Sequence, residues 1–191
     1  MDAAPRVAEA MAAWPRRAFL PRRERRHAHR DGPLPIGHGQ TNSQPRTVAA
    51  MLELLDVRPG HRVLDVGAGS GWTTTLLAHL TGPTGAVLGV ERVPELAEVG
   101  SANVRQTGMP WAHLTLAVPG VLGLPENGPF DRILVSAEPA ALPLALVEQL
   151  RPSGVMVIPI AGWMHRVVLT TEGAVLTQEH GAYRFVPLIE D

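Results

Sequence analysis

Three glycines at alternate positions, Gly67, Gly69 and Gly71, form the stretch best suited to chemistry in this sequence. They follow a short apolar run at 63–66 that contains Asp65, and a helical pattern begins directly after them. This order predicts a buried strand, a tight turn and the start of a helix. Glycine allows positive φ and a close approach of ligand to backbone, while a helix start offers unpaired N–H groups. The stretch therefore predicts a cofactor site; the alternative is a turn that binds no ligand.

The spacing of the glycines indicates which cofactor to expect. A dinucleotide turn has the pattern G-x-G-x-x-G, whereas here Trp72 occupies the place of its third glycine. With Asp65 two residues ahead, the pattern resembles the first motif of class I S-adenosylmethionine-dependent methyltransferases. The resemblance implies that Asp65 faces the cationic amino-acid end of the cofactor. A second acid, Glu91, ends the next apolar run, where such a unit presents a carboxylate to ribose hydroxyls.

Hydrophobic periodicity places this turn in a chain of alternating strands and helices. We expect helices at 7–13, 73–80, 94–106 and 143–150, one from Pro45 to the turn at 58–60, and strands at 63–66, 86–90, 114–116, 130–136, 155–158, 166–171 and 183–188. This order predicts a Rossmann-like, doubly wound α/β fold with a mostly parallel sheet, helices on both faces and an antiparallel C-terminal edge. Ligands gather outside the carboxyl ends of such strands. Four residues are therefore expected along one rim: Asp65, Glu91, Pro119 and Ser136.

The first 45 residues precede this fold. After the helix at 7–13, residues 16–30 are densely basic, and we expect a solvated arm; the alternative is a surface for nucleic acid or an acidic partner. Residues 32–40 are rich in proline and glycine, which predicts an apolar loop without regular structure. Ser43 is placed to cap the next helix, with Pro45 in its first turn.

Composition narrows the class of protein. A length of 191 residues favours one domain, 1–191, in which 1–45 supply an N-terminal helix, a basic arm and a covering loop. The net charge of −1 gives no sign of a nucleic-acid partner, and no apolar run approaches a membrane span. The absence of cysteine excludes disulfides and thiolate chemistry, and no histidine pair has zinc-helix spacing, so no metal is expected. We expect a cytoplasmic monomer or weak dimer.

Longer stretches resemble the protein-L-isoaspartate O-methyltransferase family and occur in family order: 14–21, 31–44, 62–72, 91–97, 130–137, 146–154 and 184–188. The most specific is Pro-Leu-Pro-Ile-Gly-x-Gly-Gln-Thr-x-Ser-Gln-Pro at 33–45. The resemblance implies S-adenosyl-L-methionine as cofactor and an isoaspartyl carboxylate, in a protein or peptide, as acceptor. Such a carboxylate is already a nucleophile, so methyl transfer needs alignment and desolvation more than a general base. The methyl ester then gives a succinimide, which opens partly to normal aspartate.

The resemblance also implies roles for particular residues. Ser43 would hold the acceptor, because a hydroxyl can donate to a carboxylate without quenching its charge. Substrate contacts are expected from Asn42, His38, Ser136, Ala137 and Val186, although a loop histidine such as His38 also commonly bonds to backbone. Cofactor contacts are expected from Gln40, Thr41, Asp65, Gly67, Ala68, Gly69, Ser70, Gly71, Glu91, Arg92, Val118 and Gly120.

Several positions depart from the family, and three of these departures bear most on cofactor and substrate. Val118-Pro119-Gly120 stands where the family carries Gly-Asp-Gly, whose Asp accepts from the adenine amino group; its loss removes about 0.5–1.5 kcal/mol. Glu138 replaces a usual Ala and would either repel the acceptor or face solvent, and Asn42 replaces Ile or Val. Two other functions follow from these departures: methylation of an aspartate in one dedicated partner, or a degenerate cofactor-binding module without catalysis.

Overall fold

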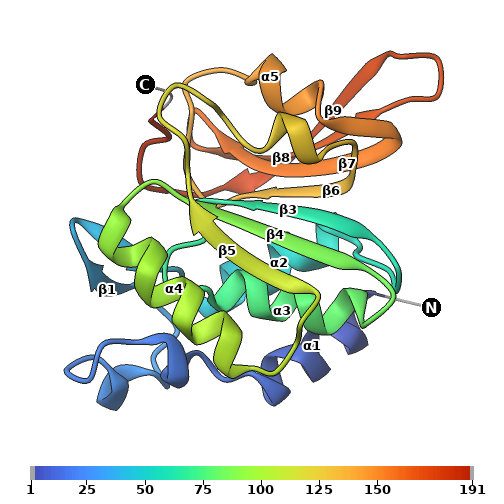
Figure 1. Cartoon of the computed structure of the whole chain (residues 1–191). Helices are drawn as coiled ribbons and strands as arrows, with labels where there is room; N and C mark the ends of the chain where they lie inside the picture. Colours follow the sequence, from blue (N-terminus) through green and yellow to red (C-terminus); the bar gives the residue numbers. More distant parts are fainter. Residues whose placement is uncertain (1–2, 190–191) are drawn as a thin grey trace.

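A seven-stranded sheet organises residues 3–189, the part of the chain that this computed structural model describes (Figure 1). Its strands lie in the order β5-β4-β3-β6-β7-β8-β9. Their bounds are β3 Arg62–Val66, β4 Ala86–Glu91, β5 Ala112–Leu116, β6 Phe130–Val135, β7 Leu150–Ile160, β8 Trp163–Leu169 and β9 Val175–Ala182. The strand pairs from β5 to β7 are parallel, whereas β8 pairs antiparallel with both β7 and β9. The predicted α/β fold with an antiparallel C-terminal edge is confirmed.

Helices cover the two faces of the sheet unequally. One face packs on α2 Pro45–Leu55, α3 Trp72–Thr81 and α4 Pro94–Gln106, with Leu52, Leu77 and Val104 in the shared core, and α1 Ala3–Ala13 packs on α2 and α3. Within residues 3–189, the other face carries α5 Leu144–Val147, the 3-10 turn η3 Pro125–Asn127 with the connection around it, and Leu188 of the C-terminal segment (Figure 1). The helix predicted at 143–150 is thus a single turn, because the chain enters β7 already at Leu150. Among residues 3–189, no helix has the length and apolarity that crossing a membrane requires.

The segment at 32–40 forms regular structure, contrary to our prediction. It contains β1 Leu34–Gly37, which pairs antiparallel with β2 Gln40–Asn42. Positive φ at Gly37, His38 and Gly39 makes the tight turn between the two strands. Leu34 and Ile36 are buried, while Pro35 between them faces out. Proline is tolerated on such an edge strand, and the alternation of buried and exposed residues is sufficient for a strand.

The basic segment is folded rather than a free arm. It contains two 3-10 turns, η1 Arg16–Phe19 and η2 Arg25–His27. Arg16 is 3% exposed, and its guanidinium donates to the carbonyl oxygens of Ala28, Arg30, Gly32 and Ser43. The prediction of a solvated arm is therefore wrong for Arg16, which fastens the segment to the chain beside β2. That residues 1–191 make up one domain stays a prediction, which these contacts support.

The start of α2 also differs from the prediction. Pro45 is at the first position as expected, but the residue before the helix is Gln44, and no side chain of its own caps it. Asp31 instead accepts from the backbone N–H of Arg46 at 3.1 Å. The Arg46 side chain donates to the same carboxylate and lowers the pKa of Asp31 to about 2. Because Asp31 satisfies the helix start, Ser43 does not act as its cap.

The C-terminal strands are shifted from those predicted. The strand expected at 166–171 lies at 163–169, and the chain pairs again at 175–182. Residues 183–188 form no strand of the main sheet; Pro187 makes one isolated parallel bridge with Glu138. Val186, predicted on a strand, lies on this extended segment.

Candidate functional site

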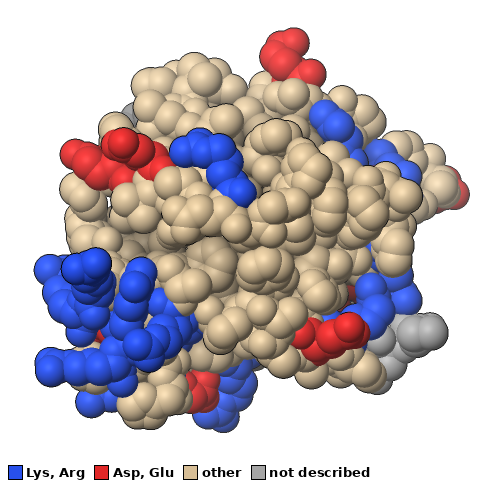
Figure 2. Space-filling view, turned by 60° about the horizontal axis from the view of Figure 1, so that its bottom comes forward, with Lys and Arg blue, Asp and Glu red and all other residues tan. Residues whose placement is uncertain are grey.

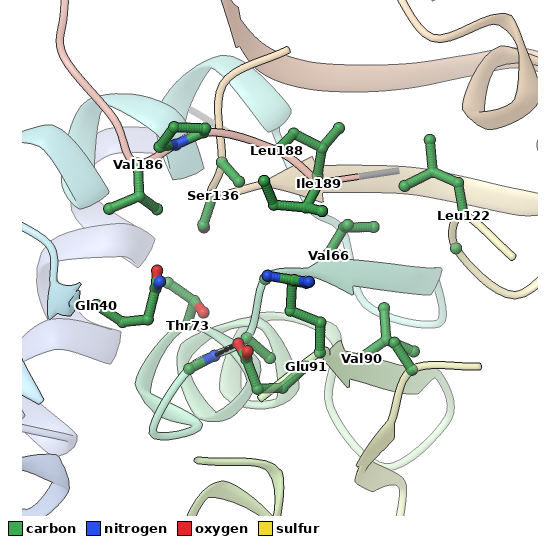
Figure 3. A pocket seen from close by; sticks show the side chains of 18 of the residues that line it. Gln40, Val66, Thr73, Val90, Glu91, Leu122, Ser136, Val186, Leu188 and Ile189 are labelled. Atoms are coloured by element: carbon green, nitrogen blue, oxygen red, sulfur yellow. Dashed lines mark hydrogen bonds between the residues drawn. The ribbon is translucent and has the colours of Figure 1, made fainter. Parts of the chain in front are cut away.

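A cavity of about 450 Å³ opens at the carboxyl ends of β3, β4 and β6. Its walls come from the β1–β2 hairpin, the glycine turn, the end of β4, the connection at 117–123, the turn after β6 and the segment at 186–189. Figure 3 shows Gln40 on one side and Leu122 on the opposite side, with Glu91 between them and Ser136, Val186 and Ile189 above it. The volume is in the range of small-molecule sites.

Most of the predicted site residues line this one cavity: Gln40, Thr41, Asn42, Ser43, Gly67, Ala68, Gly69, Ser70, Glu91, Arg92, Val118, Gly120, Ser136, Ala137 and Val186. Pro119, expected on the rim, lines it too. Three predicted residues, Asp65, Gly71 and His38, are not in its wall. The division of these residues between cofactor and substrate stays a prediction.

The glycines of the turn serve two different purposes. All three have positive φ, of 76° at Gly67, 52° at Gly69 and 85° at Gly71. Gly67 and Gly69 line the cavity and present bare backbone to it. A Cβ on Gly71 would instead lie 2.8 Å from the carbonyl oxygen of Gly100 and 2.9 Å from Val104 Cγ2 on α4. Gly71 therefore allows α4 to pack closely against the start of α3, and our assignment of it to the cofactor site is not supported by its position.

Asp65 lies beneath the turn rather than in the wall of the cavity. Its carboxylate is completely buried, and Oδ2 accepts hydrogen bonds of 2.7 Å from the hydroxyls of Thr73 and Thr74. Burial raises the pKa of Asp65 to about 6. Thr73 lines the cavity, so Asp65 orients a lining residue and the first turn of α3. We expected Asp65 to contact the cofactor directly, but Asp65 does not line the cavity, so its position does not support that contact.

Glu91 lines the cavity and also holds the glycine turn. Its Oε2 accepts from the backbone N–H of Gly69 at 2.9 Å, and its Oε1 accepts from that of Val93 at 2.9 Å. Glu91 is only 5% exposed. Each carboxylate oxygen has a further lone pair, so Glu91 can still accept from a ligand hydroxyl. Glu91 thus both fixes the conformation of the glycine turn and can bind a ligand that lies against the turn.

The β1–β2 hairpin supplies the wall opposite the 117–123 connection. Gln40, Thr41 and Asn42 on β2 and Ser43 after it all line the cavity. The carbonyl oxygen of Ser43 accepts from Arg16, whereas its hydroxyl has no hydrogen-bond partner among residues 3–189. The Ser43 hydroxyl is therefore available to a ligand. His38 is exposed at the tip of the hairpin and does not line the cavity, so its position does not support the predicted contact with substrate.

We expected Glu138 either to repel the acceptor or to face solvent. It does neither, because it does not line the cavity and its carboxylate is held by backbone N–H groups. Its Oε1 accepts from the N–H of Gly162 at 2.8 Å, and its Oε2 accepts from that of Phe185 at 3.2 Å. The backbone of Glu138 also pairs with Val186 O and with Leu188 N–H. Glu138 therefore fastens the segment at 185–188, of which 186–188 belong to the cavity wall, to the end of β6 and the β7–β8 turn.

Sequence reasoning missed much of the apolar wall. These lining residues are Ile36, Val66, Trp72, Thr73, Val90, Ala117, Val121, Leu122, Gly123, Pro187, Leu188 and Ile189. Val66 and Val90 end predicted strands beside named residues, so the rule about strand ends could have found them. Residues 187 and 188 lie in the stretch at 184–188 that resembles the family, but nothing local indicates that residues 187–189 line the cavity; the tertiary fold brings them there.

Unpartnered polar atoms indicate a polar ligand. Asn42 Oδ1 and Ser70 Oγ on the wall, and Asp65 Oδ1 beneath it, are buried without a hydrogen bond to any described residue. Leaving such a group unpaired costs about 1–3 kcal/mol. Val90 and Leu122 provide an apolar surface in the same cavity, which suits a flat base. The residues present thus fit a nucleoside with a polar tail. Within residues 3–189, no three His, Asp or Glu side chains are grouped so as to hold a metal ion.

Comparisons with known proteins agree with this geometry. The family model of the protein-L-isoaspartate(D-aspartate) O-methyltransferases matches residues 1–191. The protein-L-isoaspartate O-methyltransferase of Methanopyrus kandleri is 47% identical over 190 residues, covering 96% of this chain and 83% of that protein. That of Methanothrix thermoacetophila is 44% identical over 185 residues, covering 96% and 88%.

A solved structure shows the same fold. A Plasmodium falciparum protein described as a candidate protein-L-isoaspartate O-methyltransferase, crystallised with S-adenosyl-L-homocysteine, superimposes with a TM-score of 0.83 at 26% identity, covering 97% of this chain and 91% of that one. A match of sequence over the whole chain and a match of fold thus point the same way. This chain belongs to the protein-L-isoaspartate(D-aspartate) O-methyltransferase family.

Proposed function

We propose that this chain transfers a methyl group from S-adenosyl-L-methionine to the side-chain carboxylate of L-isoaspartyl residues in proteins or peptides. Its family membership supports this reaction. The observation that carries it is the position of Ser43, which lines the cavity that also contains the glycine turn and whose hydroxyl is unpartnered among the described residues.

The cofactor part of the cavity would be formed by the turn and by Glu91. Gly67 and Gly69 allow a ligand close to the backbone, and the Glu91 carboxylate can accept from ribose hydroxyls. The bound cofactor supplies a methyl group on a positively charged sulfur. Val118 and Pro119 leave the adenine without the usual acid, so we expect it to be held by apolar contacts with residues such as Val90 and Leu122.

The acceptor part would be formed by the hairpin and the C-terminal segment. Ser43 donates to one oxygen of the acceptor carboxylate and leaves the other oxygen free as nucleophile. Ser136, Ala137 and Val186 line the adjoining wall and would contact the peptide around the acceptor. Apolar residues of the two walls exclude water, which makes the carboxylate more reactive. No general base is needed, because the acceptor is already ionised at neutral pH.

The other functions are less well supported. Methylation of an aspartate in one dedicated partner, and a module without catalysis, both arose from departures at Glu138 and Pro119. Glu138 is held by backbone N–H groups away from the cavity wall, which removes the main reason for a changed acceptor. We keep a cytoplasmic location, a monomeric or weakly dimeric state, and the absence of nucleic-acid, membrane and metal partners as proposals.

A matched pair of peptides tests the proposed reaction. One peptide contains an isoaspartyl residue, and its twin contains aspartate at the same position. We expect methyl uptake from labelled cofactor by the isoaspartyl peptide alone. If both peptides remain unmethylated, the proposed reaction is wrong; methylation of the aspartyl twin would favour a different acceptor.

Replacement of Ser43 by alanine tests its role in that reaction. We expect Ser43→Ala to lower kcat/KM by about 100-fold, as for the loss of a positioning hydrogen bond in a closed site, while calorimetry with S-adenosyl-L-methionine gives an unchanged Kd. Turnover equal to that of the unmodified protein would refute the assignment.

A further inference from the structure

An excess of positive charge is concentrated in residues 16–31, just before the β1–β2 hairpin. Residues 16–31 contain seven arginines and only two carboxylates, in a chain whose net charge is −1. Six of these arginines have exposed side chains: Arg17, Arg22, Arg23, Arg25, Arg26 and Arg30. Figure 2 shows Arg side chains gathered at one corner of the molecule, and we call these six residues the arginine surface.

The carboxylates of this segment do not neutralise the arginine surface. Glu24 lies 3.2 Å from His27 and 3.8 Å from Arg23, and Asp31 is engaged by Arg46. The side chains of Arg17, Arg22, Arg26 and Arg30 make no hydrogen bond or ion pair with any residue of the described part of the chain. They are therefore free to bind an external anion.

The arginine surface is fastened to the hairpin that bears Ser43. The buried Arg16 guanidinium donates to Gly32 O at 2.8 Å and to Ser43 O at 3.3 Å. Leu20 packs in one apolar cluster with Ile36, which lines the cavity. The segment cannot move away from the hairpin without breaking these contacts, so its charge keeps a constant position relative to the hairpin that supplies one wall of the cavity.

We propose that the arginine surface docks acidic polypeptide segments next to the acceptor residue, so that this protein prefers isoaspartyl substrates with acidic flanks. The inference rests on the proposed function, which already requires a polypeptide in this part of the site. Guanidinium groups bind carboxylates in bidentate geometry, and clustered charge speeds encounter with oppositely charged chains. A single-stranded nucleic acid fits less well, because Phe19 is buried and residues 20–31 contain no Phe, Tyr or Trp, the large rings that stack bases in single-strand binders.

Three isoaspartyl peptides with the same acceptor and with acidic, neutral or basic flanks test the proposal. We expect kcat/KM at low ionic strength to be roughly tenfold higher for the acidic peptide than for the neutral one, and the advantage to fall to about twofold near 0.5 M salt. Equal kcat/KM for the acidic and neutral peptides would overturn the proposal. No methylation of any of the three would instead refute the proposed function, so the two failures are distinct.

Variants locate the effect. The triple variant Arg22→Gln, Arg23→Gln and Arg26→Gln is expected to lose the advantage of the acidic peptide while kcat/KM for the neutral peptide stays within twofold, a margin of about 0.4 kcal/mol. Arg105→Gln, at an exposed arginine on α4, is the control and should change neither value. An unchanged acidic preference in the triple variant would refute the assignment to these residues. Stronger inhibition by oligonucleotide than by oligoglutamate of equal length would show that nucleic acid is the preferred partner and overturn the acidic-polypeptide assignment.

Discussion

Replacing Glu138 by alanine should loosen the C-terminal wall of the site. The side chain accepts the N–H groups of Gly162 and Phe185, which lie on different segments, and Glu138→Ala leaves both without their acceptor. Bonds to charged groups contribute about 1.5–3 kcal/mol each when buried. Glu138 is half-buried, so water replaces part of each bond and we take about 1 kcal/mol apiece. The segment at 185–188 then loses about 2 kcal/mol of its docking free energy.

Steady-state methylation of an isoaspartyl peptide measures this loss. If the segment must dock again before peptide can bind, the peptide's binding free energy has to supply the docking free energy that was lost. That cost of about 2 kcal/mol corresponds to a rise in KM of up to about 30-fold. We expect kcat to change less than threefold, about 0.7 kcal/mol, because Ser43 and the glycine turn do not contact Glu138. Glu138→Gln retains a single acceptor oxygen and should give an intermediate KM.

Two results would refute this reasoning. An unchanged KM in Glu138→Ala would show that the wall keeps its position without the carboxylate. A KM below that of the unmodified protein would show that the charge repels the acceptor, as the sequence alone left open. A lower melting temperature with an unchanged KM would assign Glu138 to stability only.

Two further predictions concern the glycine turn. Gly71→Ala should lower the free energy of unfolding by about 2–4 kcal/mol in denaturant titration, because the new Cβ would lie 2.8 Å from the Gly100 carbonyl oxygen. The control is Gly173→Ala, where φ is 83° and no atom lies near the new Cβ, and it should lose only about 1 kcal/mol. Equal losses in the two variants would contradict the packing argument. The pKa of Asp65, raised by burial to about 6, lies above the ordinary value of 3.8, so its contribution to stability is present below pH 4 and lost as pH rises through 6. The free energy of unfolding should therefore fall by about 3 kcal/mol more across this window in the unmodified protein than in Asp65→Asn, and parallel profiles would contradict the assignment.

The sequence by itself determined the features that depend on local pattern. The apolar run ending at Val66, the glycines after it and the helix after them predict the strand, turn and helix that the structure contains. Each step depends on backbone freedom and hydrophobic period over a few residues, which neighbours in sequence decide. The specific motif at 33–45 likewise identified the family, since the order and types of its residues need no structure to be read.

Tertiary structure alone decided which partner each of these residues has. Gly71 packs on α4 rather than lining the cavity, Asp65 lies under the turn, and Ser43 is free because Asp31 occupies the helix start. The wall at 186–189 depends on Glu138, some fifty residues earlier in the chain. Such contacts join segments far apart in sequence, and they form because buried polar groups must find partners wherever the fold brings them. A local pattern contains no information about those partners.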